Sequence, residues 1–170
     1  VVVTYNRKNL LLECLEALRK QTRPLEAIYI VDNASTDGTP KLLFENKYIK
    51  ELPSENLDQP WEKEFKVKNL VYGAYIKIHY VRMNENSGGA GGFHEGVKRG
   101  YEKGYDWLWL MDDDTIPNIE ALSCLLEKVE SVNDLNIGFI CSKVLWTDET
   151  PHIMNVPSVK AMINGIPFNF

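Results

Sequence analysis

The sequence contains 170 residues, of which 44% are hydrophobic and 25% charged, a composition typical of one globular domain with a substantial core. Its formal net charge of -5 argues against nucleic acid as a partner, because general nucleic-acid binding needs a basic surface. No signal peptide is visible, and no apolar segment approaches the ~20 residues needed to cross a bilayer.

The first third of the sequence alternates strand-like and helix-like patterns. A β-branched run predicts a buried strand over residues 1–4, and a helix is predicted over 8–21. The helix presents an apolar stripe at the spacing of a core-facing surface, formed by Leu11, Cys14, Leu15 and Leu18. A second strand is predicted over 27–31, then a turn rich in Asp, Asn and Gly, and a second helix from about Thr39.

The pattern is lost between residues 45 and 69, where Lys, Glu, Asn and two prolines dominate. We interpret 45–69 as an inserted loop or flap, with Trp61 and Phe65 as apolar anchors, because long loops in compact domains are often functional. Alternation returns over 76–81, which predicts a third strand.

The remaining elements follow a glycine-rich segment over residues 86–93, which we expect to form a corner leading into a helix. That helix should bury a face made of Ala90, Phe93, Val97 and Tyr101. A buried strand is then predicted over 107–111, a helix over 118–132 and a further strand over 137–144.

Strands that alternate with helices predict an α/β fold with a doubly wound, mostly parallel sheet flanked by helices. We expect residues 1–170 to form a single domain. The sequence opens with Val1, already within a strand pattern, so we expect it to be part of a longer chain.

Four polar clusters follow the four predicted strands: residues 5–7, Asp32, residues 84–88 and residues 112–114. In a parallel sheet the carboxyl ends of the strands meet at one edge, where ligands bind. This convergence is the strongest functional signal in the sequence.

Asp112, Asp113 and Asp114 place three adjacent negative charges at a strand end. Side chains alternate along a strand, so Asp112 and Asp114 are expected to converge while Asp113 points to the other face and tolerates change best. Carboxylate oxygens without adjacent Cys or His suit Mg²⁺ or Mn²⁺ rather than zinc. The alternative is a solvated acidic loop, or a cap for the helix near Asn118.

Arg7 is a natural counter-charge for a diphosphate, although it could equally be a surface arginine. Asp32 could accept hydrogen bonds from a nucleobase or a ribose, or serve only its own turn. The glycine segment fits neither a P-loop nor G-x-G-x-x-G, so its glycines are better explained by close approach of the backbone to a ligand.

The three cysteines, Cys14, Cys124 and Cys141, form no CxxC pair and are expected to be buried reduced thiols, consistent with a cytoplasmic protein. His94 could contribute to the glycine corner but is more simply a surface residue. His79 and His152 lack metal-ligand spacing to the Asp triplet.

Four segments together carry a family resemblance, and they cover about residues 1–144. They are Val-Val-Thr4-Tyr5-Asn6-Arg7, Ile-Val-Asp32-Asn33-Ala-Ser35-Thr-Asp37-Gly38-Thr39, Asn86-x-Gly-Gly-x-Gly-Gly-Phe93 and Leu-Met-Asp112-Asp113-Asp114. In this order they resemble the family 2 glycosyltransferases of GT-A fold, with the glycine segment most similar to the galactofuranosyl- and rhamnosyltransferase-like branch.

The resemblance implies transfer of a sugar, with inversion, from a nucleotide diphosphate donor, UDP- or dTDP-linked, to an acceptor hydroxyl. It implies Mn²⁺ or Mg²⁺ held by Asp112 and Asp114 as a D-x-D motif. The residues implied to bind the nucleotide sugar are Thr4, Asn6, Arg7, Asp32, Asn33, Asn86, Gly89, Asp112 and Asp113. The acceptor is expected to be a glycan or a lipid-linked sugar, which implies polysaccharide biosynthesis and is compatible with peripheral association at the inner face of the cytoplasmic membrane.

The sequence departs from the family in two ways. The 45–69 insertion is longer than the usual link, and no motif after Asp114 matches the family's general base. Asp148 and Glu149 are the only late carboxylates, and we expect the base to lie beyond Phe170. Two alternatives therefore stay open: a non-catalytic nucleotide-sugar-binding module, and a nucleotidyltransferase on a similar sheet.

Overall fold

The computed structural model describes residues 1–132, 137–151, 162–163 and 166–167. The chain divides into two compact units, Val1–Ser123 and Cys124–Phe170. The large sheet and all the predicted binding residues belong to the first unit.

Strands and helices alternate through most of the first unit. In chain order the elements are β1 (Val2–Thr4), α1 (Lys8–Arg19), β2 (Ala27–Asp32), α2 (Thr39–Glu45), β3 (Trp61–Lys68), β4 (Tyr75–Arg82), α3 (Gly88–Glu102) and β5 (Met111–Asp112). The strands lie in the order β3-β4-β2-β1-β5, and only β3 runs antiparallel to its neighbour. The predicted doubly wound, mostly parallel α/β fold is confirmed.

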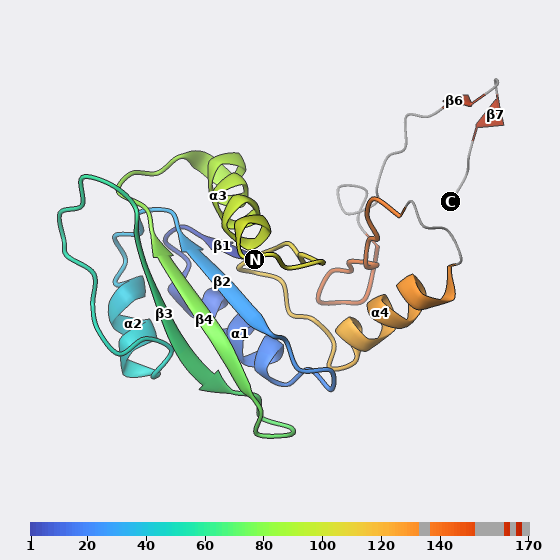
Figure 1. Ribbon diagram of the computed structural model, residues 1–170, viewed down its shortest axis with the longest axis horizontal. Coiled ribbons are helices and arrows are strands. Elements are labelled where there is room, and N and C mark those ends of the chain that lie inside the picture. The colour runs from blue at the N-terminus through green and yellow to red at the C-terminus, as the bar shows by residue number, and fades with distance from the viewer. Residues whose placement is uncertain (133–136, 152–161, 164–165, 168–170) are drawn as a thin grey trace. The chain divides into compact units, whose positions relative to one another are not determined.

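The two faces of the sheet are covered by different helices (Figure 1). Helices α1 and α2 lie on one face, and α3 lies on the other. The chain moves outward from β1 through β2 to β4 and then returns to the far side of β1 at β5. This reversal makes the carboxyl ends of β1 and β5 a topological switch point, the place where doubly wound sheets bind ligands.

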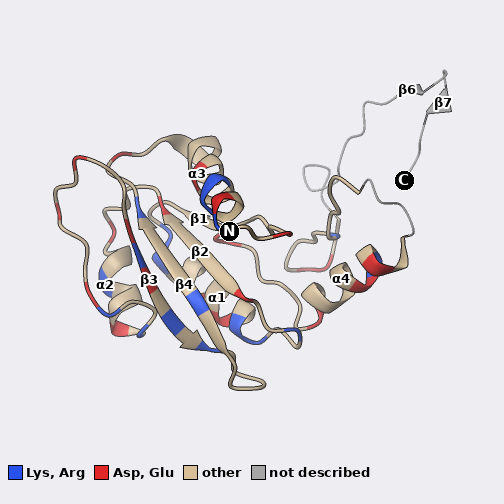
Figure 2. Ribbon diagram, in the orientation of Figure 1, with Lys and Arg blue, Asp and Glu red and all other residues tan. Residues whose placement is uncertain are grey.

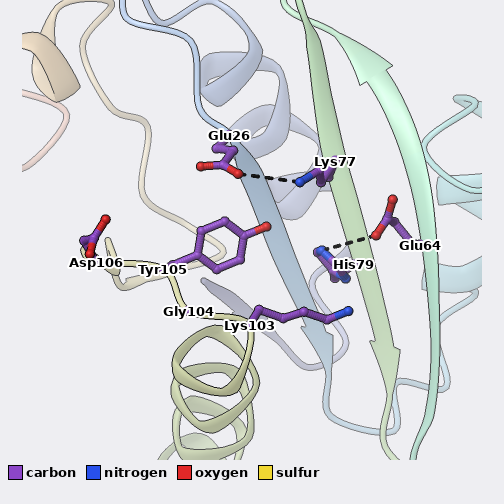
Figure 3. Close-up of a pocket in the computed structure, with 8 residues that line it drawn as sticks. All are labelled: Glu26, Glu64, Lys77, His79, Lys103, Gly104, Tyr105 and Asp106. Atoms are coloured by element: carbon purple, nitrogen blue, oxygen red, sulfur yellow. Dashed lines mark ion pairs between the residues drawn. The ribbon is translucent and has the colours of Figure 1, made fainter.

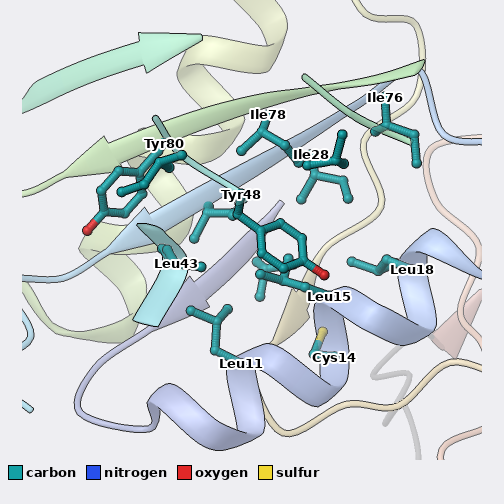
Figure 4. Packing of buried hydrophobic residues seen from close by; sticks show 14 of the residues in the cluster. Leu11, Cys14, Leu15, Leu18, Ile28, Leu43, Tyr48, Ile76, Ile78 and Tyr80 are labelled. Atoms are coloured by element: carbon teal, nitrogen blue, oxygen red, sulfur yellow. The ribbon is translucent and has the colours of Figure 1, made fainter. Parts of the chain in front are cut away.

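The main core lies between α1, α2 and the sheet (Figure 4). The predicted stripe on α1 is confirmed, because Leu11, Cys14, Leu15 and Leu18 are all buried. They pack with Ile28, Ile30, Leu43, Tyr48, Ile76, Ile78 and Tyr80 from the sheet and α2. Burial of each aliphatic side chain contributes about 1.5–3 kcal/mol to the stability of the fold. Because Val2 belongs to the same cluster, this packing holds α1 against β1.

Helix α3 packs on the sheet mainly through glycine, and only part of the predicted apolar face is confirmed. Gly92, Gly96 and Gly100 are its buried residues, and Phe93 packs against the core on this face, whereas Ala90 and Tyr101 are exposed. A Cβ added to Gly92 would come within 2.6 Å of Val3, and one added to Gly96 within 2.3 Å of Val1. The glycines therefore let α3 approach β1 and β2 closely, so part of the glycine run serves packing.

Two predicted elements of the first unit need correction. The loop expected over 45–69 contains β3, an edge strand that alternates buried Phe65 and Val67 with exposed charged residues. The buried strand expected over 107–111 is limited to β5, and Trp107 is exposed. The pairing of β5 with β1 starts at Met111, which lies opposite Val2.

The second unit begins within α4 (Ala121–Ser131) and contains the short antiparallel pair β6 (Met162–Ile163) and β7 (Ile166–Pro167). No residue of α4 is buried, and 137–144 forms no strand, contrary to prediction. Cys14 is buried as expected, but Cys124 and Cys141 are exposed; none of the three is in a disulfide. Among the described helices, none is long and apolar enough to cross a membrane.

Candidate functional site

The carboxyl ends of four neighbouring strands bring the predicted polar residues together. Thr4 ends β1, Asp32 ends β2, Arg82 ends β4 and Asp112 ends β5. Thr4 and Asp32 are direct partners in the β1–β2 register, and Asp32 and Arg82 are partners in the β2–β4 register. A single edge of the sheet therefore carries the candidate site.

Asp113 connects the carboxyl ends of β1 and β5 through its side-chain contacts. The Thr4 hydroxyl donates a hydrogen bond to Asp113 Oδ2 at 2.6 Å, and Arg7 Nη1 lies 3.6 Å from Asp113 Oδ1. The same Arg7 nitrogen donates to Asp114 Oδ2 at 2.8 Å. Arg7 thus joins the end of β1 to the Asp triplet, as a counter-charge for anionic groups should.

The exposure of the triplet alternates as expected: Asp113 is only 3% exposed, whereas Asp112 and Asp114 are exposed. Strand β5 ends at Asp112, and the chain then turns with the Thr115 N–H donating to the Asp112 carbonyl. The sequence did not indicate that the buried Asp113 side chain would contact Thr4 and Arg7. We therefore expect Asp113 to be the member of the triplet least tolerant of change.

Electrostatics at the triplet favour a bound cation. Burial, followed by the charge of Asp114, raises the pKa of Asp112; burial also raises the pKa of Asp113, opposed by the Thr4 hydrogen bond and Arg7. The exposed carboxylates of Asp112 and Asp114 offer hard oxygen donors suited to Mg²⁺ or Mn²⁺. Among the described residues, no three His, Cys, Asp or Glu side chains are grouped so that they could hold a metal ion by themselves.

Asp32 lies fully buried at the end of β2 with three hydrogen-bond donors around its carboxylate. The Ser35 N–H donates to Oδ1 at 2.8 Å, while the Tyr80 hydroxyl and Arg82 Nη1 donate to Oδ2 at 2.7 and 2.8 Å. Arg82 also donates to the Ser35 carbonyl. Sequence reasoning missed Arg82, although a basic residue at the carboxyl end of a strand was the available signal.

Asn33 and Asn86, both predicted to contact the donor, contact each other. Asn33 Nδ2 donates to Asn86 Oδ1 at 2.8 Å and to the Gly88 carbonyl at 2.9 Å, and Asn33 Oδ1 accepts from the Ser87 N–H. Gly88 has a left-handed φ of 73°, which favours glycine at this turn. The two amides thus hold the entry into α3, next to Gly89 in its first turn.

Asn6 performs a similar supporting role beside β1. Its Oδ1 accepts hydrogen bonds from the Thr36 N–H at 2.6 Å and from the Asp37 N–H at 3.2 Å. Asn6 itself has a left-handed φ of 55°, and its own N–H donates to Ser35 Oγ. The side chain therefore fixes the turn after β2 against the turn after β1. Its contact with a donor stays a prediction.

The histidines lie apart from this edge. His94 is exposed on α3, and His152 lies outside the described residues. His79 is buried, stacks on Tyr29 with ring centroids 4.3 Å apart, and has Nδ1 3.2 Å from Glu62 Oε1. It lines a polar cavity of about 210 Å³ with Glu26, Glu64, Lys77, Lys103, Gly104, Tyr105 and Asp106 (Figure 3). Lys77 and Glu26 lie at the amino ends of β4 and β2, so this cavity is at the opposite end of the sheet from the candidate site.

Asp148 and Glu149, the carboxylates considered near the end of the sequence, lie in one turn. Asp148 Oδ1 accepts hydrogen bonds from the Thr150 N–H and hydroxyl, at 3.0 and 2.6 Å. Glu149 has a left-handed φ of 66° in the same turn. Asp148 is therefore taken up by its own turn.

Comparisons with known proteins agree with the geometry of the sheet edge. The model of the family described as "Glycosyl transferase family 2" matches residues 1–162. No solved structure matches.

Three curated proteins match, each named galactofuranosyltransferase GlfT1. The protein from Mycolicibacterium smegmatis is 33% identical over 127 residues, which cover 74% of this chain and 33% of that protein. Those from two strains of Mycobacterium tuberculosis are 32% identical over 114 residues, 67% of this chain and 29% of each protein. The chain thus spans about a third of the length of the curated relatives it matches.

Proposed function

Because this chain belongs to glycosyltransferase family 2, we propose that it binds the nucleotide diphosphate sugar in an enzyme that transfers the sugar, with inversion, to an acceptor hydroxyl. The relatives' names suggest a galactofuranosyl donor as the first to test. UDP- and dTDP-linked sugars are the donors we expect, and a glycan or a lipid-linked sugar is the acceptor, with nucleic acid excluded by the acidic charge.

One arrangement carries this proposal: Arg7 lies between Asp113 and Asp114 at the β1–β5 switch point. Arg7 can exchange its contact with Asp114 for a phosphate oxygen, because its planar fork binds phosphate as well as carboxylate. That exchange would leave Asp112 and Asp114 available as metal ligands. A bound Mn²⁺ or Mg²⁺ would neutralise the diphosphate as it leaves.

The neighbouring residues would hold the nucleoside part of the donor. The Thr4–Asp113 hydrogen bond ties the end of β1 to the residue after β5, which would hold the two strand ends in fixed positions around the donor. The Asp32 carboxylate is fully buried and is held by Ser35, Tyr80 and Arg82, so direct contact with a base or a ribose would require one of these partners to move. Asn33 and Asn86 would orient Gly89 so that the backbone at the start of α3 approaches the donor.

Metal-dependent nucleotide binding tests the proposal. We expect UDP or dTDP to raise the melting temperature only when Mn²⁺ or Mg²⁺ is present. Asp114→Ala should abolish the shift, since it removes an exposed ligand without opening the core. Asp106→Ala, which also removes an exposed aspartate of the first unit, should leave it intact.

Two results would count against the proposal. The first is a nucleotide shift that is equal with and without metal. The second is an Asp106→Ala effect as large as that of Asp114→Ala. A whole protein that binds the donor but neither transfers nor hydrolyses the sugar would favour the non-catalytic binding module instead. Release of pyrophosphate from a sugar phosphate and a nucleoside triphosphate would favour a nucleotidyltransferase.

A further inference from the structure

The turn between β3 and β4 exposes a group of apolar side chains at the end of the sheet away from the donor site. We call residues 69–75 the hairpin tip. Tyr72 and Tyr75 are 66% and 67% exposed, and Leu70 and Val71 are 47% and 43% exposed. Four large apolar side chains within six residues form a contiguous exposed group, which marks an interaction surface.

The hairpin tip is held rigidly. Asn69 is buried, and its Oδ1 accepts hydrogen bonds from the Val71 and Tyr72 N–H groups at 2.9 and 2.8 Å. Asn69 Nδ2 donates to the Gln21 carbonyl, and the Leu70 N–H donates to the Arg19 carbonyl at the end of α1. Because the backbone is fixed, presenting these side chains to a partner costs little conformational entropy.

Basic side chains surround the hairpin tip although the chain is acidic overall (Figure 2). On one face of the β3–β4 pair, Glu64 lies opposite His79, then Lys66 opposite Lys77, then Lys68 opposite Tyr75. The charge on this face therefore changes from acidic to basic toward the tip. Lys20, exposed at the end of α1, adds a further positive charge next to the tip.

Among the described residues, neither Lys66 nor Lys68 forms an ion pair. Lys66 and Lys77 lie directly opposite each other, an arrangement of like charges that destabilises a sheet. Glu26 lies 3.5 Å from Lys77 (Figure 3) and compensates it in part. Lys68 Nζ lies 5.6 Å from the centre of the Tyr75 ring. An external anionic surface would supply the missing negative charge.

We propose that the hairpin tip docks on an anionic membrane surface. Tyrosine is favoured at the membrane–water interface because its ring enters the headgroup layer while its hydroxyl stays hydrated. Lysines behind the tyrosines gain from the negative surface potential of anionic lipids. Neither feature requires a membrane-spanning helix.

This orientation places the donor site away from the bilayer. The tip precedes β4, whereas the site lies at the carboxyl end of β4, eight residues further on. At roughly 3.3 Å per residue the strand is about 25 Å long. A lipid-linked acceptor would have to extend its sugars over that distance, so the geometry suits an acceptor that already carries several sugars.

The test measures binding of the whole protein to vesicles in the absence of nucleotide, so it is independent of the proposed sugar transfer. We expect the protein to sediment with phosphatidylcholine vesicles that contain roughly 30% phosphatidylglycerol, an anionic lipid that gives the surface a negative potential. We expect little of the protein to sediment with vesicles of pure phosphatidylcholine. Tyr72→Ser with Tyr75→Ser should weaken binding about fivefold. Tyr101→Ser, which changes a tyrosine that is 80% exposed on α3, should not.

Charge variants provide a second comparison at equal net charge. Lys66→Glu with Lys68→Glu should weaken binding at least about 30-fold, whereas Lys41→Glu with Lys98→Glu, on α2 and α3, should have little effect. An unchanged melting temperature for each variant would show that the fold is retained.

Three results would overturn the proposal. They are absence of parent binding to the anionic vesicles, equal losses for tip and control variants, and tip variants that change the oligomeric state while vesicle binding stays intact. The last result would assign the hairpin tip to a protein partner.

Discussion

Two neighbouring side chains hold the buried carboxylate of Asp32 in place. Arg82 supplies a positive charge at 2.8 Å, and Tyr80 supplies a hydroxyl donor at 2.7 Å, both to Oδ2. The two partners differ in what their loss leaves behind. Without Arg82 the carboxylate is buried without a counter-charge, whereas without the Tyr80 hydroxyl it loses one hydrogen bond of several.

This difference predicts unequal costs for two substitutions that preserve side-chain bulk. Arg82→Met should lower the free energy of unfolding by about 3–5 kcal/mol, the cost of breaking a buried ion pair. Tyr80→Phe should lower it by about 1–3 kcal/mol, since the ring stays in the core. Urea denaturation of both variants measures the two values. Equal effects would contradict the view that Arg82 neutralises Asp32.

At the scale of secondary structure, the glycines of α3 divide into two groups. Gly92, Gly96 and Gly100 are buried against β1, β2 and Leu108, so they have no room for a side chain. Gly89 lies at the start of the same helix with nothing within 4 Å of an added Cβ. The first group serves packing, and Gly89 is free to serve the ligand.

Alanine substitutions should change the free energy of unfolding in opposite directions in the two groups of glycines. Gly96→Ala should cost about 1–3 kcal/mol of stability, because the new methyl group would overlap Val1 and the helix would have to move away from the sheet. Gly89→Ala should add up to about 1 kcal/mol, the usual preference of a helix for alanine. Thermal denaturation tests both. A stabilised Gly96→Ala would show that α3 is not packed closely on β1.

The helices and strands that were predicted well are those that bury an apolar stripe or an apolar run of their own residues. Helix α1 and strands β2 and β4 carry an apolar stripe or run that any neighbouring layer would bury, so the sequence alone locates them. Strand β3 was missed because it lies at the edge, and its exposed face is filled with charged residues that resemble a loop. The length of β5 depends on its pairing with β1, which local pattern does not record.

The candidate site also combines features that the sequence predicted with features that depend on the folded backbone. The order of strand ends predicted that Thr4, Arg7, Asp32 and the Asp triplet would meet at one edge. The contacts of Asp113 with Thr4 and Arg7 were not predicted, because they depend on how β1 and β5 pair in the folded sheet. The partnership of Asn33 with Asn86 depends on the tight turn at Gly88, which only the folded backbone defines.

At the scale of the whole molecule, charge and function are separated along the first unit. The carboxylates and Arg7 lie at one edge of the sheet, and the basic hairpin tip lies at the opposite end of β4. Strand β1 connects the edge that carries the candidate donor site to the core. Val2 belongs to the core cluster, and Thr4, two residues after Val2, donates a hydrogen bond to Asp113 at that edge. Ligand binding at the edge should therefore stabilise the core that contains Cys14.

The reactivity of the thiols should report this coupling. Cys14 is fully buried next to Met111 of β5, and burial raises the pKa of its thiol to about 12, so it should resist alkylation at pH 8 until the first unit opens. Cys124 and Cys141 are exposed and should react at once. Peptide mass spectrometry can follow the three sites separately.

Donor binding should then slow the labelling of Cys14 alone. A ligand present at 100 times its Kd adds about 2.7 kcal/mol to the stability of the native state, which reduces the open population about 100-fold. UDP with Mn²⁺ should produce this protection, and Asp114→Ala should remove it. The rates at Cys124 and Cys141 serve as internal controls for the reagent and should not change. If Cys14 reacted as fast as Cys124 without ligand, or if the nucleotide protected all three thiols equally, the coupling between the donor edge and the core of the first unit would be refuted.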